Sequence, residues 1–266
     1  MAKHAIKNGA LILEEEALVP ITSREVQQNF SVYEALRIID NKVVHLRDHY
    51  KRLQGSAETI GLKLNMSYEE LENSLKLLLE ADNLTDATVR IVVYGGKLDT
   101  VFITWENLLT YPDSYYTEGI KVITYEGERF LPTCKTSNLL LNYLAREKAS
   151  ESGAFEALLI DRFNRVLEGT RSNFYAIKDN VLFTAPDELV LSGVTRISVL
   201  QAAEELGLTI VYEAVEASTL YDYDEVFISS TSMAAMPICE IDGKQVRKEH
   251  PITLKIKDRV RELETV

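Results

Sequence analysis

Residues 31–62 are SVYEALRIIDNKVVHLRDHYKRLQGSAETIGL, and their pattern predicts a hairpin followed by a helix. The first nine side chains alternate well enough between apolar and polar types to favour a strand. DNK at 40–42 supplies a turn and VVHL begins a return strand, so residues 30–46 are interpreted as a β-hairpin. A helix is expected over residues 47–62, ending near Gly61.

A second helix is expected where Ser67 and Glu70 have the spacing of a capping box. Apolar residues follow it at helical spacing, at Leu71, Leu75 and Leu78. The stretches ATVRIVVYGG (87–96) and TVFITWENLL (100–109) then resemble a pair of strands. The first part of the chain is therefore expected to combine helices with a β-sheet.

The pattern breaks in LTYPDSYYTEGI (109–120), which is the candidate boundary between a lobe of residues 1–114 and a lobe of residues 115–266. Further strands are expected at KVITYEG (121–127), EALLIDR (156–162), NFYAIKD (173–179) and EVFIS (225–229), and helices at about 137–151, 196–206 and 253–264. No internal repeat or long linker is visible, so the expected fold class is α+β in two lobes.

Composition and charge narrow the class of protein. With 266 residues and 46% hydrophobic side chains, the chain can bury a sizeable core. Its net charge of -12 and its lack of a basic run argue against a nucleic-acid partner. Cys134 and Cys239 form no metal-ligand spacing and no disulfide framework. Neither a signal peptide nor a membrane span is indicated, so we expect a cytoplasmic protein without a bound metal.

Four short stretches place polar or small residues where a strand is expected to meet a turn or helix. They are TCKTSN (133–138), RVLEGTRSN (165–173), SGVTR (192–196) and SSTSMAAMP (229–237). In the first, Lys135 lies between a proline and a run of leucines. A surface lysine needs no explanation, but a part-buried lysine can lose its proton and become a nucleophile.

The stretch SGVTR opens an expected helix. Thr195 is interpreted as its N-cap, and the expected buried stripe consists of Val199, Ala202, Ala203 and Leu206. Free N–H groups at a helix start bind anions, and Gly193 would allow a close approach. An ordinary capped helix explains the same residues.

Two further stretches are open to two interpretations each. Ser230, Thr231 and Ser232 form a hydroxyl-rich turn that could bind a second set of anion oxygens, although serine-rich turns are common. Glu168 precedes Gly169 and is either a solvated turn residue or a carboxylate directed at a buried cation.

The order of these motifs resembles the class IV aminotransferases, the pyridoxal-phosphate enzymes that include D-amino-acid and branched-chain aminotransferases and aminodeoxychorismate lyase. Residues 31–62 are similar to the opening hairpin and helix of that family, with a His-x-x-Arg-Leu signature at His49–Leu53. The resemblance covers roughly residues 10–245. It implies an N-terminal α/β sandwich lobe, a C-terminal β-barrel-like lobe with helices, and a homodimer.

The resemblance also implies roles for individual residues. Lys135 would form an imine with pyridoxal 5'-phosphate, and burial and a cationic neighbourhood would depress its pKa into the nucleophilic range. Glu168 would keep the pyridine nitrogen of the cofactor protonated. The cofactor phosphate would be bound by Arg52, Gly193, Val194, Thr195, Ser230 and Thr231.

The expected substrates are small amino acids and 2-oxo acids, and three reactions compete. Glu34 and Ala35 stand where aminodeoxychorismate lyases carry hydroxyls, so transamination of a branched-chain or D-amino acid is favoured over pyruvate-releasing lysis. The short connection after VVYGG leaves chirality open. A binding module without activity is the third alternative, but it would not need Lys135.

The candidate substrate residues lie in both lobes. Tyr33 would form part of the pocket floor, and Arg37 and Arg90 would bind carboxylate unless they face water, as strand arginines often do. Ser232 is the remaining candidate contact.

Overall fold

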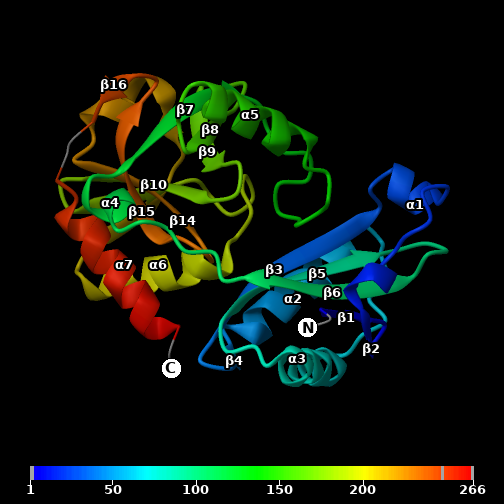
Figure 1. Ribbon diagram of the computed structural model, residues 1–266. Helices are drawn as coiled ribbons and strands as arrows, with labels where there is room; N and C mark the ends of the chain where they lie inside the picture. Colours follow the sequence, from blue (N-terminus) through cyan, green and yellow to red (C-terminus); the bar gives the residue numbers. More distant parts are fainter. Residues whose placement is uncertain (1–2, 247–248, 265–266) are drawn as a thin grey trace. The chain divides into compact units, whose positions relative to one another are not determined.

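The computed structural model describes residues 3–246 and 249–264, which form two compact units (Figure 1). The first unit contains the described residues up to Leu109 together with Cys134–Asn138, and the second contains Thr110–Thr133 and the described residues from Leu139 onward. The division differs from the expected boundary after residue 114 because the tyrosine-rich segment packs against the core of the second unit, where Tyr111 and Tyr115 contact Phe155.

The first unit is built on an antiparallel sheet with the strand order β2-β1-β6-β5-β3-β4. Its strands are β1 (His4–Lys7), β2 (Ala10–Leu13), β3 (Ser31–Ile39), β4 (Lys42–Val43), β5 (Ala87–Tyr94) and β6 (Thr100–Asn107). Its helices are η1 (Glu14–Glu16), α1 (Arg24–Gln27), α2 (Leu46–Thr59) and α3 (Tyr68–Asp82). The predicted hairpin, both predicted helices and the predicted strand pair are confirmed.

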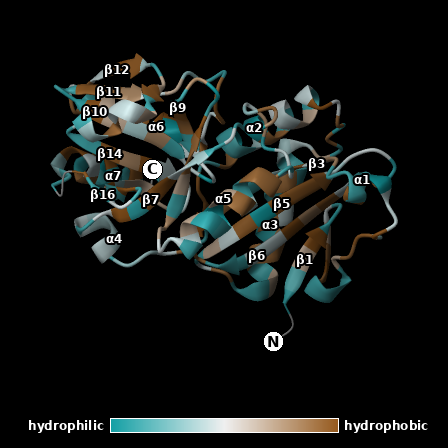
Figure 2. Ribbon diagram, turned by 90° about the horizontal axis from the view of Figure 1, so that it is seen from above, coloured by the Kyte–Doolittle hydropathy of each residue, from teal (hydrophilic) through white to brown (hydrophobic). Residues whose placement is uncertain are grey.

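Helices α2 and α3 cover one face of this sheet. Val32, Leu36 and Ile38 of β3 pack in one core with apolar residues of both helices, chiefly Leu53, Leu71, Leu75 and Leu78. Figure 2 shows the central strands β3 and β5 largely in the hydrophobic colour. The predicted capping box is present: Ser67 Oγ accepts a hydrogen bond from the Glu70 backbone N–H at 3.2 Å, and the Glu70 carboxylate accepts one from the Ser67 N–H at 2.7 Å.

The second unit is a closed β-barrel with helices packed around it. Its strands are β7 (Ile120–Glu126), β8 (Glu156–Ile160), β9 (Arg165–Gly169), β10 (Asn173–Lys178), β11 (Val181–Thr184), β12 (Thr209–Tyr212), β13 (Val215–Glu216), β14 (Glu225–Ser230), β15 (Ala234–Ile241) and β16 (Lys244–Gln245). The ring runs β10-β14-β15-β7-β8-β9 and closes where Glu168 of β9 pairs with Asn173 of β10. The expected barrel-like lobe is thereby confirmed.

The helices of the second unit are α4 (Ser114–Thr117), α5 (Leu140–Glu151), η2 (Ala217–Asp222), α6 (Val194–Glu205) and α7 (Pro251–Leu263). Helix α5 packs on β8 through Ala145 and Ala149. Helices α6 and α7 pack together against β14 and β15, with Val199 and Ile256 in the shared core (Figure 1). Among the described residues, no helix is both long enough and apolar enough to cross a bilayer.

Two details of the predicted helices are wrong. Helix α6 begins at Val194 with Gly193 as its N-cap, so Thr195 lies inside the first turn and is not the cap. Leu206 does not belong to the buried stripe, because it is the C-cap and is 40% exposed. Helix α5 also starts later than expected, at Leu140, because the N–H of Ser137 bonds to the carbonyl of Ser31 in an extended pairing.

Two glycines near the C-terminal end of α2 predict opposite effects on stability. A Cβ on either Gly55 or Gly61 would meet no atom within 4 Å, but Gly61 has a φ of +68° whereas Gly55 lies inside the helix. Gly55→Ala should raise the free energy of unfolding by about 0.5–1 kcal/mol, because alanine loses less backbone entropy in a helix.

Gly61→Ala should lower the free energy of unfolding by about 1–2 kcal/mol, because an L-residue is strained in the left-handed region. Urea unfolding followed by circular dichroism measures both changes. Shifts of the same sign in the two variants would contradict the assigned backbone conformations.

Candidate active site

Lys135 is fixed by its backbone at the edge of the first unit's sheet. Its carbonyl accepts a hydrogen bond from the Tyr33 N–H at 3.0 Å, and its own N–H donates to Ser56 Oγ of α2 at 3.0 Å. Thr136 forms a bridge with Val32 of β3. The segment Cys134–Asn138 thus extends the sheet by a short stretch, which sets the direction in which the Lys135 side chain leaves the backbone.

The Tyr33 ring brings together two of the predicted side chains. The Lys135 Nζ and the Arg90 guanidinium carbon each lie 4.6 Å from the ring centroid. Side chains alternate along β3, so Tyr33 and Arg37 lie on the face opposite to the apolar core. Arg90 is opposite Ala35 in the register and is therefore a diagonal neighbour of both Tyr33 and Arg37.

Arg90 is exposed, whereas Arg37 is buried. The structure therefore groups the three first-unit candidates for substrate binding, Tyr33, Arg37 and Arg90, on one face of the sheet. The interpretation in which Arg37 is a solvent-facing strand arginine is wrong for this residue.

Arg52 is held by a buried carboxylate that sequence reasoning did not assign to the site. Glu34 Oε1 accepts from Arg52 Nε and Glu34 Oε2 accepts from Arg52 Nη2, both at 2.7 Å. The same Oε2 lies 2.8 Å from His49 Nδ1. His49 and Arg52 are three residues apart on α2, so the His-x-x-Arg signature places both side chains on one face, directed at Glu34.

The charge states within this cluster follow from burial and proximity. Burial by itself raises the pKa of Glu34, but the positive charge and hydrogen bonds of Arg52 outweigh it, with help from His49, and hold that pKa well below its usual range. Burial lowers the pKa of His49, and the charges of Arg52 and Lys135 lower it further against the opposing effect of Glu34. At neutral pH, Glu34 is therefore ionised and His49 is neutral, with Nδ1–H donating to the carboxylate.

Glu168 lies in the second unit at the seam of the barrel and is buried. Its Oε1 is 3.3 Å from Arg129 Nη1, and its Oε2 accepts from the Leu191 backbone N–H at 3.2 Å. The interpretation of Glu168 as a solvated turn residue is wrong; the carboxylate faces a mostly buried cation. Arg129 was not found from the sequence, because it lies in an irregular segment without a periodic pattern.

The start of α6 has the donor chemistry of an anion site. This helix has 12 residues and no side chain caps its N-terminus, so the backbone N–H groups of Val194 and Thr195 have no helical acceptor. A Cβ on Gly193 would lie 2.3 Å from Asn173 Oδ1, so only glycine fits there. The buried Thr195 side chain adds a hydroxyl donor in the first turn.

Asn173 connects this helix start with the hydroxyl-rich turn of the second unit. Its Nδ2 donates to the Leu191 carbonyl at 2.7 Å, and its backbone pairs with Ser229 at the end of β14. The turn follows directly, with Ser230 Oγ 3.3 Å from Ser232 Oγ. Two uncharged sets of donors therefore lie on either side of one asparagine, and this arrangement fits a phosphate group.

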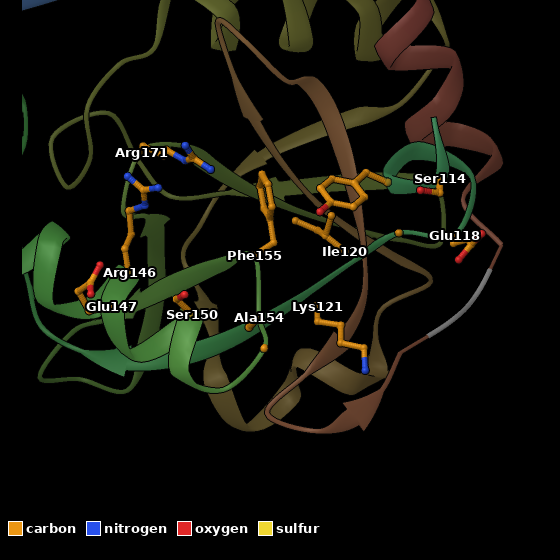
Figure 3. A pocket seen from close by; sticks show the side chains of 13 residues that line it. Ser114, Glu118, Ile120, Lys121, Arg146, Glu147, Ser150, Ala154, Phe155 and Arg171 are labelled. Atoms are coloured by element: carbon orange, nitrogen blue, oxygen red, sulfur yellow. The ribbon is translucent and has the colours of Figure 1, made fainter. Parts of the chain in front are cut away.

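A separate cavity of about 570 Å³ also lies in the second unit (Figure 3). Arg146 and Arg171 lie at one side of it, and the Arg171 guanidinium carbon is 5.1 Å from the Phe155 ring centroid. None of the residues predicted from the sequence lines this cavity.

Comparisons with known proteins were made for the whole chain. Residues 31–241 match the family model described as amino-transferase class IV. The D-alanine aminotransferase of Bacillus licheniformis is 36% identical over 256 residues, covering 92% of this chain and 90% of that protein. A putative branched-chain-amino-acid aminotransferase of Methanocaldococcus jannaschii is 31% identical, covering 97% of this chain and 95% of that protein.

Similarity to a solved structure extends over nearly the full length of both chains. The branched-chain amino acid aminotransferase of the organism abbreviated T.th., solved with pyridoxamine 5'-phosphate, superposes with a TM-score of 0.92. It is 26% identical in sequence, and the match covers 100% of this chain and 95% of that one.

Proposed function

The chain belongs to the class IV aminotransferases, and from that premise we propose that it transfers an amino group from D-alanine or a branched-chain amino acid to a 2-oxo acid. The cofactor in this proposal is pyridoxal 5'-phosphate. The observation that carries the proposal is the position of Lys135, whose backbone is bound on both sides while its side chain extends over the Tyr33 ring.

Lys135 is the nucleophile in this proposal. Bound pyridoxal phosphate supplies a ring that accepts the electrons left when the α-proton of an amino acid is removed. The Lys135 amine would bind the aldehyde carbon of the cofactor and then carry a proton to and from the substrate α-carbon. A primary amine on a flexible stem can do both, and the fixed backbone limits where that amine can reach.

Glu168 would stabilise a proton on the pyridine nitrogen. Its contacts with Arg129 and the Leu191 N–H favour the ionised carboxylate, which is the form that accepts a hydrogen bond from a protonated nitrogen.

The second unit would bind the phosphate group through uncharged donors. We assign to this role the residues Gly193, Val194, Thr195, Ser230 and Thr231. Arg52 of the first unit would add charge-assisted hydrogen bonds.

The substrate carboxylate would be bound by the first unit. Arg37 and Arg90 carry the matching charge, and Tyr33 lies between Arg90 and Lys135. Ser232 of the second unit, whose hydroxyl is 3.1 Å from that of Tyr111, is the further proposed contact. The relatives named above are aminotransferases, so lysis of aminodeoxychorismate has no support among them.

We also propose a cytoplasmic homodimer. Neither cysteine forms a disulfide within the described part of the chain, which fits a reducing compartment. Helix α5 exposes three large apolar side chains at helical spacing on one face: Leu140 is 67% exposed, Tyr143 61% and Leu144 49%. An apolar helix face of this kind is typical of a surface that a second copy covers.

Lys135→Ala should abolish transamination and the label that borohydride leaves on a lysine after incubation with pyridoxal phosphate. Peptide mapping by mass spectrometry locates that label. Lys148→Ala is the control, because Lys148 is an exposed lysine on α5. A pyridoxyl group on another lysine, or full activity in Lys135→Ala, would refute the assignment.

The substrate class is tested with a panel of D- and L-amino acids, with pyruvate and 2-oxoglutarate as acceptors. We expect turnover with D-alanine or with at least one of leucine, isoleucine and valine. Chromatography of the products measures it. Inactivity toward the whole panel, together with release of pyruvate from aminodeoxychorismate, would replace the aminotransferase proposal with a lyase.

Leu144→Glu should convert the dimer into monomers, because a charge on the α5 face opposes burial. Ile197→Glu is the matched control, since Ile197 is an exposed apolar residue of α6. Light scattering after size exclusion gives the mass. A monomeric wild-type protein, or a Leu144→Glu variant that stays dimeric, would rule out this interface.

A further inference from the structure

We propose that Glu34 is a positioning residue, which fixes the orientation of Arg52 and His49 and so sets the affinity of the first unit for the cofactor. The proposal rests on the proposed function, because it assigns to Arg52 a role in binding the cofactor phosphate. It goes beyond that function by explaining why an acidic residue is buried inside the sheet.

The contacts of Glu34 use both of its oxygens. The two 2.7 Å hydrogen bonds to Arg52 involve different nitrogens and different oxygens, so they fix the plane of the guanidinium as well as its distance. The third contact, to His49 Nδ1 at 2.8 Å, fixes the ring and selects the Nδ1–H tautomer.

The cost of this arrangement argues against a purely structural role. Glu34 lies on the face of β3 that also carries Val32, Leu36 and Ile38, all of which are in the apolar core. A well-packed apolar side chain at such a position is often at least as stable as a buried ion pair. A carboxylate buried among apolar neighbours therefore points to a requirement other than stability.

One face of α2 connects the Glu34 cluster with Lys135. Ser56 lies four residues after Arg52 on this face, and its hydroxyl accepts a hydrogen bond from the Lys135 N–H. The helix that orients Arg52 therefore also fixes the backbone of Lys135.

Charge balance gives Glu34 a second effect. Its negative charge offsets that of Arg52, and Lys135 is close enough for its charge to influence His49. Without the Glu34 charge, the guanidinium and the lysine would repel each other more strongly. A neutral replacement should therefore disturb both the orientation of Arg52 and the electrostatic environment of Lys135.

The test compares Glu34→Gln with Glu225→Gln. Glu225 is the matched control: it is also buried, and its carboxylate accepts from the Ile252 N–H at 2.9 Å and from the N–H and hydroxyl of Thr253, but it belongs to the second unit. Both variants lose the charge of a buried, hydrogen-bonded carboxylate, so both should be less stable. Only Glu34→Gln should bind pyridoxal phosphate more weakly, by about tenfold or more.

A second measurement follows the side chains in the cofactor-free protein. Nitrogen-15 NMR should show a well-dispersed, slowly exchanging Arg52 Nε–H and a single His49 tautomer in the wild type, and both signatures should be lost in Glu34→Gln. Glu34→Asp keeps the charge on a shorter stem, so its affinity for pyridoxal phosphate should be intermediate. That variant also provides the test if Glu34→Gln does not fold.

The outcomes separate the two proposals. A wild-type protein that does not bind pyridoxal phosphate would overturn the proposed function. Wild-type affinity and unchanged Arg52 and His49 signals in Glu34→Gln, in a protein that binds the cofactor, would overturn the role of Glu34 alone. Equal losses of affinity in Glu34→Gln and Glu225→Gln would also overturn it, because they would reduce the effect to general destabilisation.

Discussion

A fully buried carboxylate cannot remain ionised without partners, and the first unit is organised around this constraint at Glu34. The effective cost of burying one ion is several kcal/mol, and removing one partner of a buried pair typically costs about 3–5 kcal/mol. Both Arg52 and His49 must therefore face β3, which sets the rotation of α2 about its own axis. The same rotation buries Leu53 and directs Ser56 at the Lys135 backbone. One electrostatic requirement thus determines how strand, helix and lysine are arranged.

In the second unit, the corresponding constraint is closure of the barrel. Strands β9 and β10 pair at a single position, Glu168 opposite Asn173, and both residues also contact the loop that precedes α6. Space is limited here: a Cβ on Gly169 would lie 2.2 Å from Ser172 Oγ, and one on Gly193 would overlap Asn173. The backbone can close only because two side chains are missing. Closure therefore places a carboxylate and an uncapped helix start next to the same asparagine.

The sequence predicted what local interactions determine. The hairpin at 30–46 and the capping box at Ser67 depend on residues close together in the chain, and both are present. The four-residue strands β1, β2, β11 and β12 were not predicted, because so short a segment has no clear periodicity and depends on its neighbours. The cap of α6 was assigned to Thr195 because threonine is a good N-cap, whereas the Asn173 side chain requires glycine next to the helix.

Non-local contacts account for most of what the sequence did not reveal in the candidate site. The types of residue were found, since Lys135, Glu168 and the two anion-binding turns stand out as motifs. Their partners were not, because Glu34 contacts Arg52 across 18 positions and Arg129 approaches Glu168 across 39. The return of Cys134–Asn138 to the first unit is likewise invisible in a strand or helix pattern, because it consists of a few backbone hydrogen bonds.

The distribution of charge explains how a chain with a net charge of -12 can bind anions. Screening limits the reach of an exposed charge to about 8 Å at physiological ionic strength, so a binding site responds mainly to the groups that surround it. In the second unit, the proposed phosphate donors are backbone N–H groups and hydroxyls, which add no net charge. In the first unit, Glu34 offsets Arg52, which leaves Lys135 and Arg90 as the cations beside the Tyr33 ring. The local field beside Tyr33 is therefore positive although the protein as a whole is acidic, and it favours a substrate carboxylate at this place over others on the surface.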